Sequence, residues 1–224
     1  MADPGQVAVV VGATGLVGQE ILAVLLADKT YRSVHVVGRR KLQQTHPKLI
    51  QQVVDFAAMP RLPQADEVYI ALGTTIKVAG SKAAFRAIDL DAVVAVGRAA
   101  CASGATKLGV VSAMGADRKS AVFYNQVKGE MEEALASLGF QSLVIARPSL
   151  LVGAREALGQ PVRRGERIGM VVTQLFKPLI PVNYRAVQAQ DVAHALVHAV
   201  HTATAGTYCL LSGEMQGASR GSRA

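Results

Sequence analysis

The first two thirds of the chain alternate short apolar runs with longer stretches of helical periodicity. Residues 7–11 (VAVVV) form a continuous apolar run, which is typical of a strand buried on both faces of a parallel sheet. Strands are expected at 7–11, 33–37, 51–54, 67–72, 107–112, 141–146 and 207–211, and helices at 16–26, 82–102, 121–138 and 191–203. This alternation predicts βαβ units, and hence an α/β fold with a doubly wound parallel sheet of the Rossmann type.

The pattern loosens after Arg147 and Pro148, where a helix is expected at 165–176 and Asp191 is expected to be the N-cap of the last helix. The chain has no internal repeat and no linker, so a single domain is predicted over residues 1–211, with the part from about 149 onward forming the substrate side. Residues 212–224, rich in Gly, Ser and Arg, predict a flexible tail. The apolar segment 170–181 fits a substrate mouth, a dimer contact or a membrane surface equally well.

Composition excludes several classes of protein. Half of the 224 residues are hydrophobic and 18% are charged, which is incompatible with a disordered chain. The net charge of +8 is scattered along the sequence, and the chain has no Trp and only 4% aromatic residues to stack on bases. A basic cofactor site on a solvated surface is therefore favoured over nucleic-acid binding as the main function.

Cysteine and histidine give no metal signature. The two cysteines do not stand at metal-ligand spacing, so we expect no metal site and a reducing, cytoplasmic environment. His194, His198 and His201 fall on one helical face, but without an acidic partner they are better explained as part of an ordinary amphipathic helix. No apolar run reaches the ~18 residues that a membrane span requires.

A glycine-rich loop follows the first expected strand and opens the first helix. The G-x-x-G-x-x-G spacing in this context predicts a loop that carries a pyrophosphate on the N-terminus of the helix. The residues expected to bind the cofactor here are Gly12, Ala13, Thr14, Gly15, Leu16, Val17 and Gly18.

The end of the second expected strand distinguishes the two nicotinamide cofactors. NAD-binding Rossmann folds usually place an acidic residue there to bond the ribose 2′-hydroxyl, whereas this chain has Gly38, Arg39, Arg40 and Lys41. Arginine can pair with a 2′-phosphate through a bidentate fork. We therefore expect NADP(H), with Arg39 as the main contact and Arg40 as the second; the weaker alternative is a solvated basic turn.

Three residues form a candidate catalytic group: Ser112, Tyr124 and Lys128. Ser112 ends the fifth expected strand, and Tyr124 and Lys128 stand four residues apart, which places them on one face of a helix. A phenol can donate the proton that carbonyl reduction requires, and a nearby ammonium and the cationic nicotinamide are both expected to lower its pKa. The alternative is a chance pair on the wet face of an ordinary helix.

The chain resembles the atypical short-chain dehydrogenases/reductases, in particular the Tat-interacting-protein-like group. The resemblance extends from residue 7 to about residue 191. It rests on the GATGLVG loop, GRRKL (38–42), VVDF (53–56), LGTT (72–75), Ser112, YNQVKGE (124–130) and RPSLLVG (147–153).

The resemblance implies roles for further residues. Asp55 would bond the adenine amino group and Phe56 would lie beside the base. The other implied cofactor contacts are Leu72, Gly73, Thr74, Thr75 and Pro148. Ser112, Tyr124 and Lys128 match the catalytic triad of the family, whereas Asp89 is expected only to orient the helix that follows it.

We therefore expect an NADP(H)-dependent oxidoreductase that acts on a small carbonyl or alcohol. Tyr124 would be the acid/base, Lys128 would tune its pKa and hold the ribose, and Ser112 would be the oxyanion partner. The alternative is an NADPH-binding regulatory or sensor protein without significant turnover. The sequence leaves the substrate and the oligomeric state open.

Overall fold

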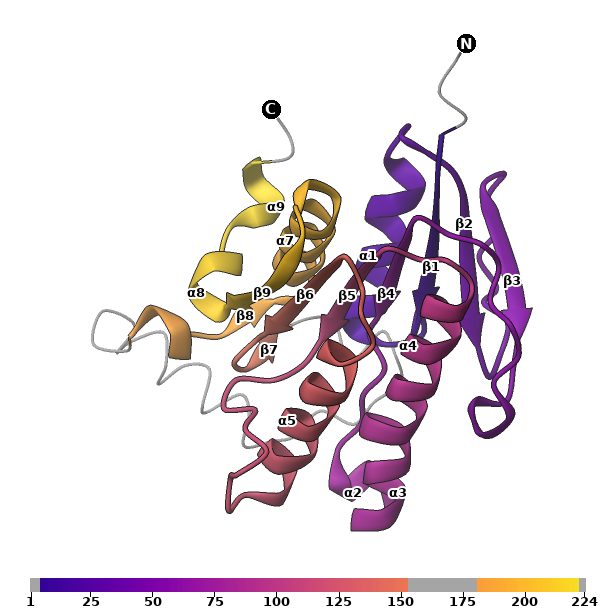
Figure 1. Cartoon of the computed structure of the whole chain (residues 1–224). Coiled ribbons are helices and arrows are strands. Elements are labelled where there is room, and N and C mark those ends of the chain that lie inside the picture. The colour runs from indigo at the N-terminus through magenta and orange to yellow at the C-terminus, as the bar shows by residue number, and fades with distance from the viewer. Residues whose placement is uncertain (1–4, 153–180, 222–224) are drawn as a thin grey trace.

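The computed structural model describes residues 5–152 and 181–221 (Figure 1). Its centre is a parallel sheet of seven strands in the order β3-β2-β1-β4-β5-β6-β9. The strands are β1 (Gln6–Val11), β2 (Tyr31–Gly38), β3 (Leu49–Val53), β4 (Glu67–Ile70), β5 (Lys107–Val111), β6 (Ser142–Arg147) and β9 (Gly206–Leu211). The strand order reverses between β1 and β4, which confirms the predicted doubly wound Rossmann fold.

Helices cover both faces of the sheet. In Figure 1, α4 and α5 lie in front of it and α1 and α7 behind it. The helical segments are α1 (Leu16–Ala27), η1 (Phe56–Ala58), α2 (Ile76–Ala79), α3 (Lys82–Arg86), η2 (Ala87–Ala92), α4 (Val93–Ala102), α5 (Phe123–Ala136), η5 (Val182–Tyr184), α7 (Ala189–Thr202), α8 (Ser212–Met215) and α9 (Ala218–Gly221). Two buried cores result, one on each side of the sheet.

The central strand β1 shows why its sequence is apolar throughout. Successive side chains of a strand point to opposite faces. Val9 and Val11 belong to the core on the α4 and α5 side, whereas Ala8 and Val10 belong to the core on the α1 and α7 side. Because both faces are covered, every one of these positions has to be apolar.

The long helix expected at 82–102 is interrupted. Residues of η2 form a π-helical turn, which is wider than an α-turn because its hydrogen bonds run from i to i+5. Asp89 within this turn is completely buried. Such turns are rare in proteins, and those that occur are often found at functional sites. Asp89 is therefore a candidate site residue.

The C-terminal part corrects two predictions. Helix α7 begins at Ala189, so Asp191 lies in its first turn rather than at the N-cap, and the Asp191 carboxylate accepts hydrogen bonds from the Ser219 backbone N–H (3.1 Å) and hydroxyl (2.6 Å). The tail predicted from Ser212 instead forms α8 and α9, because the fully buried Met215 and the Asp191–Ser219 contact attach it to α7.

Two short strands were not expected. β7 (Leu151–Val152) and β8 (Val187–Gln188) form a separate parallel pair on the predicted substrate side. The helix expected at 165–176 and the apolar segment up to residue 180 lie outside the described residues. No helix in the described ranges is long and apolar enough to cross a membrane.

Helix α5 is fixed in place by a close contact with the loop that precedes it. A Cβ on Gly129 would lie 2.1 Å from the backbone nitrogen of Arg118, so only glycine permits this approach. Asp117 also donates its backbone N–H to the carbonyl of Asn125. The loop after β5 and the first turns of α5 therefore form one packed unit.

Candidate functional site

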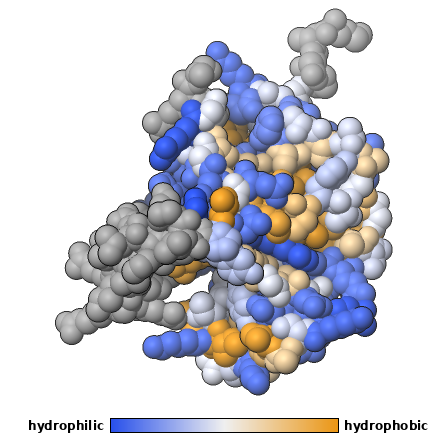
Figure 2. Space-filling model, turned by 90° about the vertical axis from the view of Figure 1, so that its left-hand side faces the viewer, coloured by the Kyte–Doolittle hydropathy of each residue, from blue (hydrophilic) through white to orange (hydrophobic). Residues whose placement is uncertain are grey.

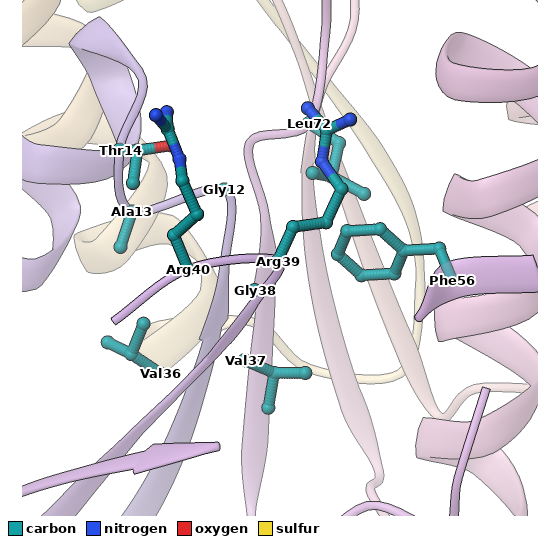
Figure 3. Close-up of a pocket in the computed structure, with 10 residues that line it drawn as sticks. All are labelled: Gly12, Ala13, Thr14, Val36, Val37, Gly38, Arg39, Arg40, Phe56 and Leu72. Carbon is teal, nitrogen blue, oxygen red and sulfur yellow. The ribbon is translucent and has the colours of Figure 1, made fainter. Parts of the chain in front are cut away.

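A pocket opens where β1 and β2 end (Figure 3). Its lining comes from the loop after β1, the end of β2 with the turn after it, η1 and the loop after β4. The lining residues are Gly12, Ala13, Thr14, Val36, Val37, Gly38, Arg39, Arg40, Phe56 and Leu72. Since open α/β sheets bind ligands at the carboxyl ends of their strands, beside the point where the strand order reverses, this is where a nucleotide is expected.

The turn between β1 and α1 fits a phosphate group. Gly12 adopts φ +93°, and a Cβ there would lie 2.5 Å from the carbonyl oxygen of Ala71. Helix α1 begins after Gly15, and no side chain in the described part of the chain caps its first turn by a hydrogen bond. Its free N–H groups and the positive end of its dipole can therefore receive an anion.

Two arginines border the opening. Figure 3 shows the Arg40 side chain extending toward Thr14 and the Arg39 side chain extending toward Leu72 and Phe56. Both arginines are exposed. None of the pocket-lining residues, all within the described ranges, is acidic, so the two cations meet no carboxylate in the lining.

Other predicted cofactor residues lie outside this lining. Gly15, Leu16, Val17 and Gly18 form the start of α1. Asp55 is exposed, and its carboxylate caps η1 by accepting the backbone N–H of Ala57 at 3.0 Å. Pro148 is buried, and its carbonyl accepts the backbone N–H of Met114. Gly73, Thr74 and Thr75 form the loop after β4.

Lys128 lies at the centre of the second group of site residues. Its ammonium is 2.7 Å from the Asp89 carboxylate, and the two side chains are only 4% and 0% exposed. The other oxygen of Asp89 accepts the backbone N–H of Thr74 at 2.9 Å. A Cβ on Gly73 would lie 3.9 Å from the Lys128 nitrogen. Asp89 on η2 thus connects Lys128 on α5 with the loop after β4.

Tyr124 stands one turn before Lys128 on the same face of α5 and packs against the ring of Phe85, with ring centres 5.4 Å apart. Burial, together with the negative charge of Asp89, raises the pKa of Tyr124 to about 12. The expected lowering of this pKa is therefore wrong for the chain by itself. The main reason is burial of the phenol, and the Asp89 carboxylate, which forms an ion pair with Lys128, adds a second charge that disfavours the phenolate.

Ser112 does follow β5, as predicted, but its hydroxyl is already engaged. The Ser112 Oγ donates to the Glu132 carboxylate at 2.5 Å, and Arg147 donates to the same carboxylate through Nε (3.1 Å) and Nη2 (2.5 Å). Ser112 and Glu132 are 5% and 6% exposed. The hydrogen bonds to Glu132 raise the pKa of Arg147, so this guanidinium stays charged.

Several residues of the site were not assigned from the sequence. Val36, Val37 and Gly38 line the pocket because they form the carboxyl end of β2. Glu132 had a signal, since it follows Lys128 by four residues on the same face of α5. Asp89 had none, because only the tertiary fold brings it to Lys128.

Some exposed apolar side chains lie on strands, namely Ile50, Val53 and Tyr208, and the others lie in segments between strands. Val78 follows β4, Val122 follows β5, Leu150 follows β6, and Val182 and Tyr184 precede α7. Figure 2 shows apolar side chains interrupting the hydrophilic surface of one face of the molecule. Within the described part of the chain, no group of three or more His, Cys, Asp or Glu residues is gathered as a metal site.

Comparison with curated proteins finds clear relatives. The chain is 31% identical over 214 residues to protein FMP52, mitochondrial, of Coccidioides immitis, covering 88% of this chain and 87% of that protein. It is 36% identical over 155 residues to protein FMP52-1, mitochondrial, of Scheffersomyces stipitis, covering 66% and 69%. It is 33% identical over 154 residues to protein HTATIP2 of Rattus norvegicus, covering 66% and 63%. No family model matches the chain.

Solved structures share the fold at low sequence identity. The Bordetella bronchiseptica enzyme WbmH, solved with NAD+, has a TM-score of 0.67 and 18% identity, covering 93% of this chain and 76% of its own. A short chain dehydrogenase family protein from Francisella tularensis has a TM-score of 0.65 and 13% identity, covering 94% and 98%. These structures show that the chain shares their fold.

The comparisons also correct one prediction. The FMP52 relatives from fungi carry the word mitochondrial in their names. The cytoplasmic location expected from the cysteines is therefore contradicted, because two cysteines without a disulfide do not distinguish the cytoplasm from other compartments.

Proposed function

We propose that this chain, which belongs to the short-chain dehydrogenase/reductase family of the FMP52 and HTATIP2 proteins, is an NADP(H)-dependent oxidoreductase of small carbonyls or alcohols. The observation that carries the proposal is the position of Lys128, which is buried beside Gly73 and one turn from Tyr124. The Tyr124 hydroxyl, a proton donor, and the Lys128 ammonium, a cation, thereby lie near the loop that follows β4. Such a site suits proton transfer to a ligand held at the carboxyl ends of the strands.

The cofactor would be held by residues from several elements. The turn from Gly12 to Gly15 and the start of α1 would receive the pyrophosphate, and Phe56 and Leu72 would border the adenine. When bound, the nicotinamide supplies or accepts a hydride. WbmH and MoeE5, two structures with this architecture, were solved with NAD.

The preference for NADP(H) is inferred from Arg39 and Arg40. Each can form charge-assisted hydrogen bonds to a 2′-phosphate, worth about 1.5–3 kcal/mol. We expect Arg39→Ala and Arg40→Ala each to weaken NADPH binding by about 10- to 100-fold, and NADH binding by less than about threefold. Titration of NADPH and NADH fluorescence measures both affinities.

A matched control removes the same charge elsewhere. Arg98 is exposed on α4, outside the pocket lining, so Arg98→Ala should leave both affinities unchanged. If the unaltered chain binds NADH as tightly as NADPH, the inferred role of the arginines is wrong.

Tyr124 would act on the substrate oxygen. Because its pKa is raised to about 12, the hydroxyl keeps its proton at neutral pH and can donate it to a carbonyl oxygen that receives a hydride on carbon. The apolar residues that follow the strands, among them Val122 and Leu150, favour a small and largely apolar carbonyl compound.

A regulatory NADPH-binding protein is the second candidate. Two observations favour it: without ligand Tyr124 is a poor base, and the Ser112 hydroxyl is bonded to Glu132. A panel of aldehydes, ketones and quinones separates the candidates, with loss of NADPH absorbance as the signal. Tight NADPH binding without turnover of any compound would favour the regulatory candidate.

A further inference from the structure

Glu132 lies one turn after Lys128, on the face of α5 that carries Tyr124 and Lys128. Tyr124, Lys128 and Glu132 follow each other at intervals of four residues, and the last two are buried. Lys128 is paired with Asp89, whereas Glu132 connects the residues that follow β5 and end β6. We name Ser112, Glu132 and Arg147 the Glu132 group.

The hydrogen bonds of this group determine what Ser112 can offer to a ligand. A serine hydroxyl has one proton and two lone pairs. A carboxylate oxygen accepts, and both Glu132 oxygens face donors: Oε1 faces Ser112 Oγ and Arg147 Nε, and Oε2 faces Arg147 Nη2. The proton of Ser112 is therefore directed to Glu132, and its remaining capacity is that of an acceptor.

The backbone holds Ser112 in this position. Its N–H donates to the carbonyl of Ala146 at 2.8 Å, which continues the pairing of β5 with β6. Arg147 is the next residue on β6, and its side chain is 32% exposed, compared with 7% for that of Glu132. Rotating the hydroxyl away from Glu132 would leave a buried carboxylate oxygen with one fewer donor, which is unfavourable.

We infer that Glu132, held by Arg147, is a positioning residue that makes Ser112 a hydrogen-bond acceptor, so that the site selects carbonyl substrates with a neighbouring hydroxyl or N–H. This inference rests on the proposed function and narrows its substrate class. Tyr124 is then the donor to the reacting oxygen, and Ser112 binds the second polar group of the substrate.

A pair of probes that differ in one hydrogen-bond donor tests the inference. Hydroxyacetone and methoxyacetone present the same ketone, but only the first has an adjacent O–H. With NADPH, the unaltered chain is expected to show a KM for hydroxyacetone about 2- to 10-fold lower than for methoxyacetone, with similar kcat. This ratio corresponds to the net value of one hydrogen bond.

Variants of the group assign the preference to Ser112 and Glu132. Ser112→Ala should abolish it and Ser112→Thr, which keeps a hydroxyl, should restore it. The double variant Glu132→Met/Arg147→Met removes both charges and frees the Ser112 proton, so the KM for methoxyacetone should fall to that for hydroxyacetone. Glu133→Gln is the matched control, because Glu133 pairs with Arg118 on the surface, and should change neither KM.

Two results would overturn the inference. One is a loss of kcat of about 10²- to 10³-fold on both probes in Ser112→Ala with the KM ratio unchanged, since that is the effect of removing an oxyanion donor. The other is turnover of both probes by the unaltered chain with the same KM. If the double variant does not fold, the ratio of the two KM values in Ser112→Ala and Ser112→Thr is sufficient to test the inference.

Failure of the proposed function is distinguishable from failure of this inference. If the chain binds NADPH but turns over neither these probes nor any compound of the carbonyl panel, the proposed turnover is refuted. Binding of the two probes is then followed through the fluorescence of bound NADPH. Tighter binding of hydroxyacetone that depends on Ser112 would still support the inference, whereas equal binding would reject it.

Discussion

Asp89→Asn is expected to lower the free energy of unfolding by about 3–5 kcal/mol, the effect of leaving one buried charge without its partner. Lys128 is 4% exposed and would lose the carboxylate that lies 2.7 Å from its ammonium. Asparagine keeps an oxygen that can accept the Thr74 N–H, so the backbone contact is preserved. Urea denaturation measures the change.

Two controls show that the effect comes from the buried pair. Glu130→Gln breaks the ion pair with Arg86, whose side chains are 25% and 44% exposed, and should change stability by less than about 1 kcal/mol. The double variant Asp89→Leu/Lys128→Met removes both charges and should recover most of the lost stability. A loss below about 1 kcal/mol in Asp89→Asn itself would refute the importance of the ion pair.

Tyr124→Phe is expected to lower turnover by about 10²- to 10⁴-fold, the range for loss of a general acid. The aromatic ring remains packed against Phe85, so the free energy of unfolding should change by no more than about 1 kcal/mol. The NADPH affinity should change by no more than a few-fold. Steady-state kinetics with the best carbonyl of the panel, beside NADPH titration, measures both effects.

Phe123→Leu provides the control for the tyrosine variant. Phe123 is the preceding residue of α5, and its ring lies 6.1 Å from that of Phe85, but it carries no proton to donate. It should keep most of the turnover. Undiminished turnover in Tyr124→Phe would show that the proton comes from another group.

The parts of the site that the sequence predicted are those encoded locally. The apolar run of β1 followed by Gly12 specifies a strand, a turn and a helix over a few neighbouring residues. Tyr124 and Lys128 were recognisable because helical periodicity relates residues four apart. Arg39 and Arg40 were recognisable because they directly follow a strand.

The parts that could not be predicted depend on contacts between distant segments. Asp89 meets Lys128 only because a π-helical turn faces α5, and the sequence AIDLDA reads as ordinary helix. Ser112 meets Glu132 and Arg147 across three elements, so its hydroxyl proton is donated to Glu132. A pKa depends on all such neighbours, which is why burial and Asp89 raise the pKa of Tyr124 in the chain by itself, where Lys128 alone was expected to lower it.

The absence of Trp makes tyrosine ionisation directly visible in the near ultraviolet. Tyr31 and Tyr69 should not contribute to this absorbance change, because burial and the Glu67 carboxylate raise their pKa well above the usual value of about 10. The difference between the unaltered chain and Tyr124→Phe therefore isolates Tyr124.

The central claim is that Tyr124 is the proton donor of a site completed by NADP(H), and its titration with and without NADP+ tests this most directly. Without NADP+, Tyr124 should remain protonated through the range in which an ordinary tyrosine ionises. With NADP+ bound, the positive nicotinamide ring should lower its pKa, so that a signal absent from Tyr124→Phe appears at lower pH. Identical titrations with and without NADP+ would contradict the claim.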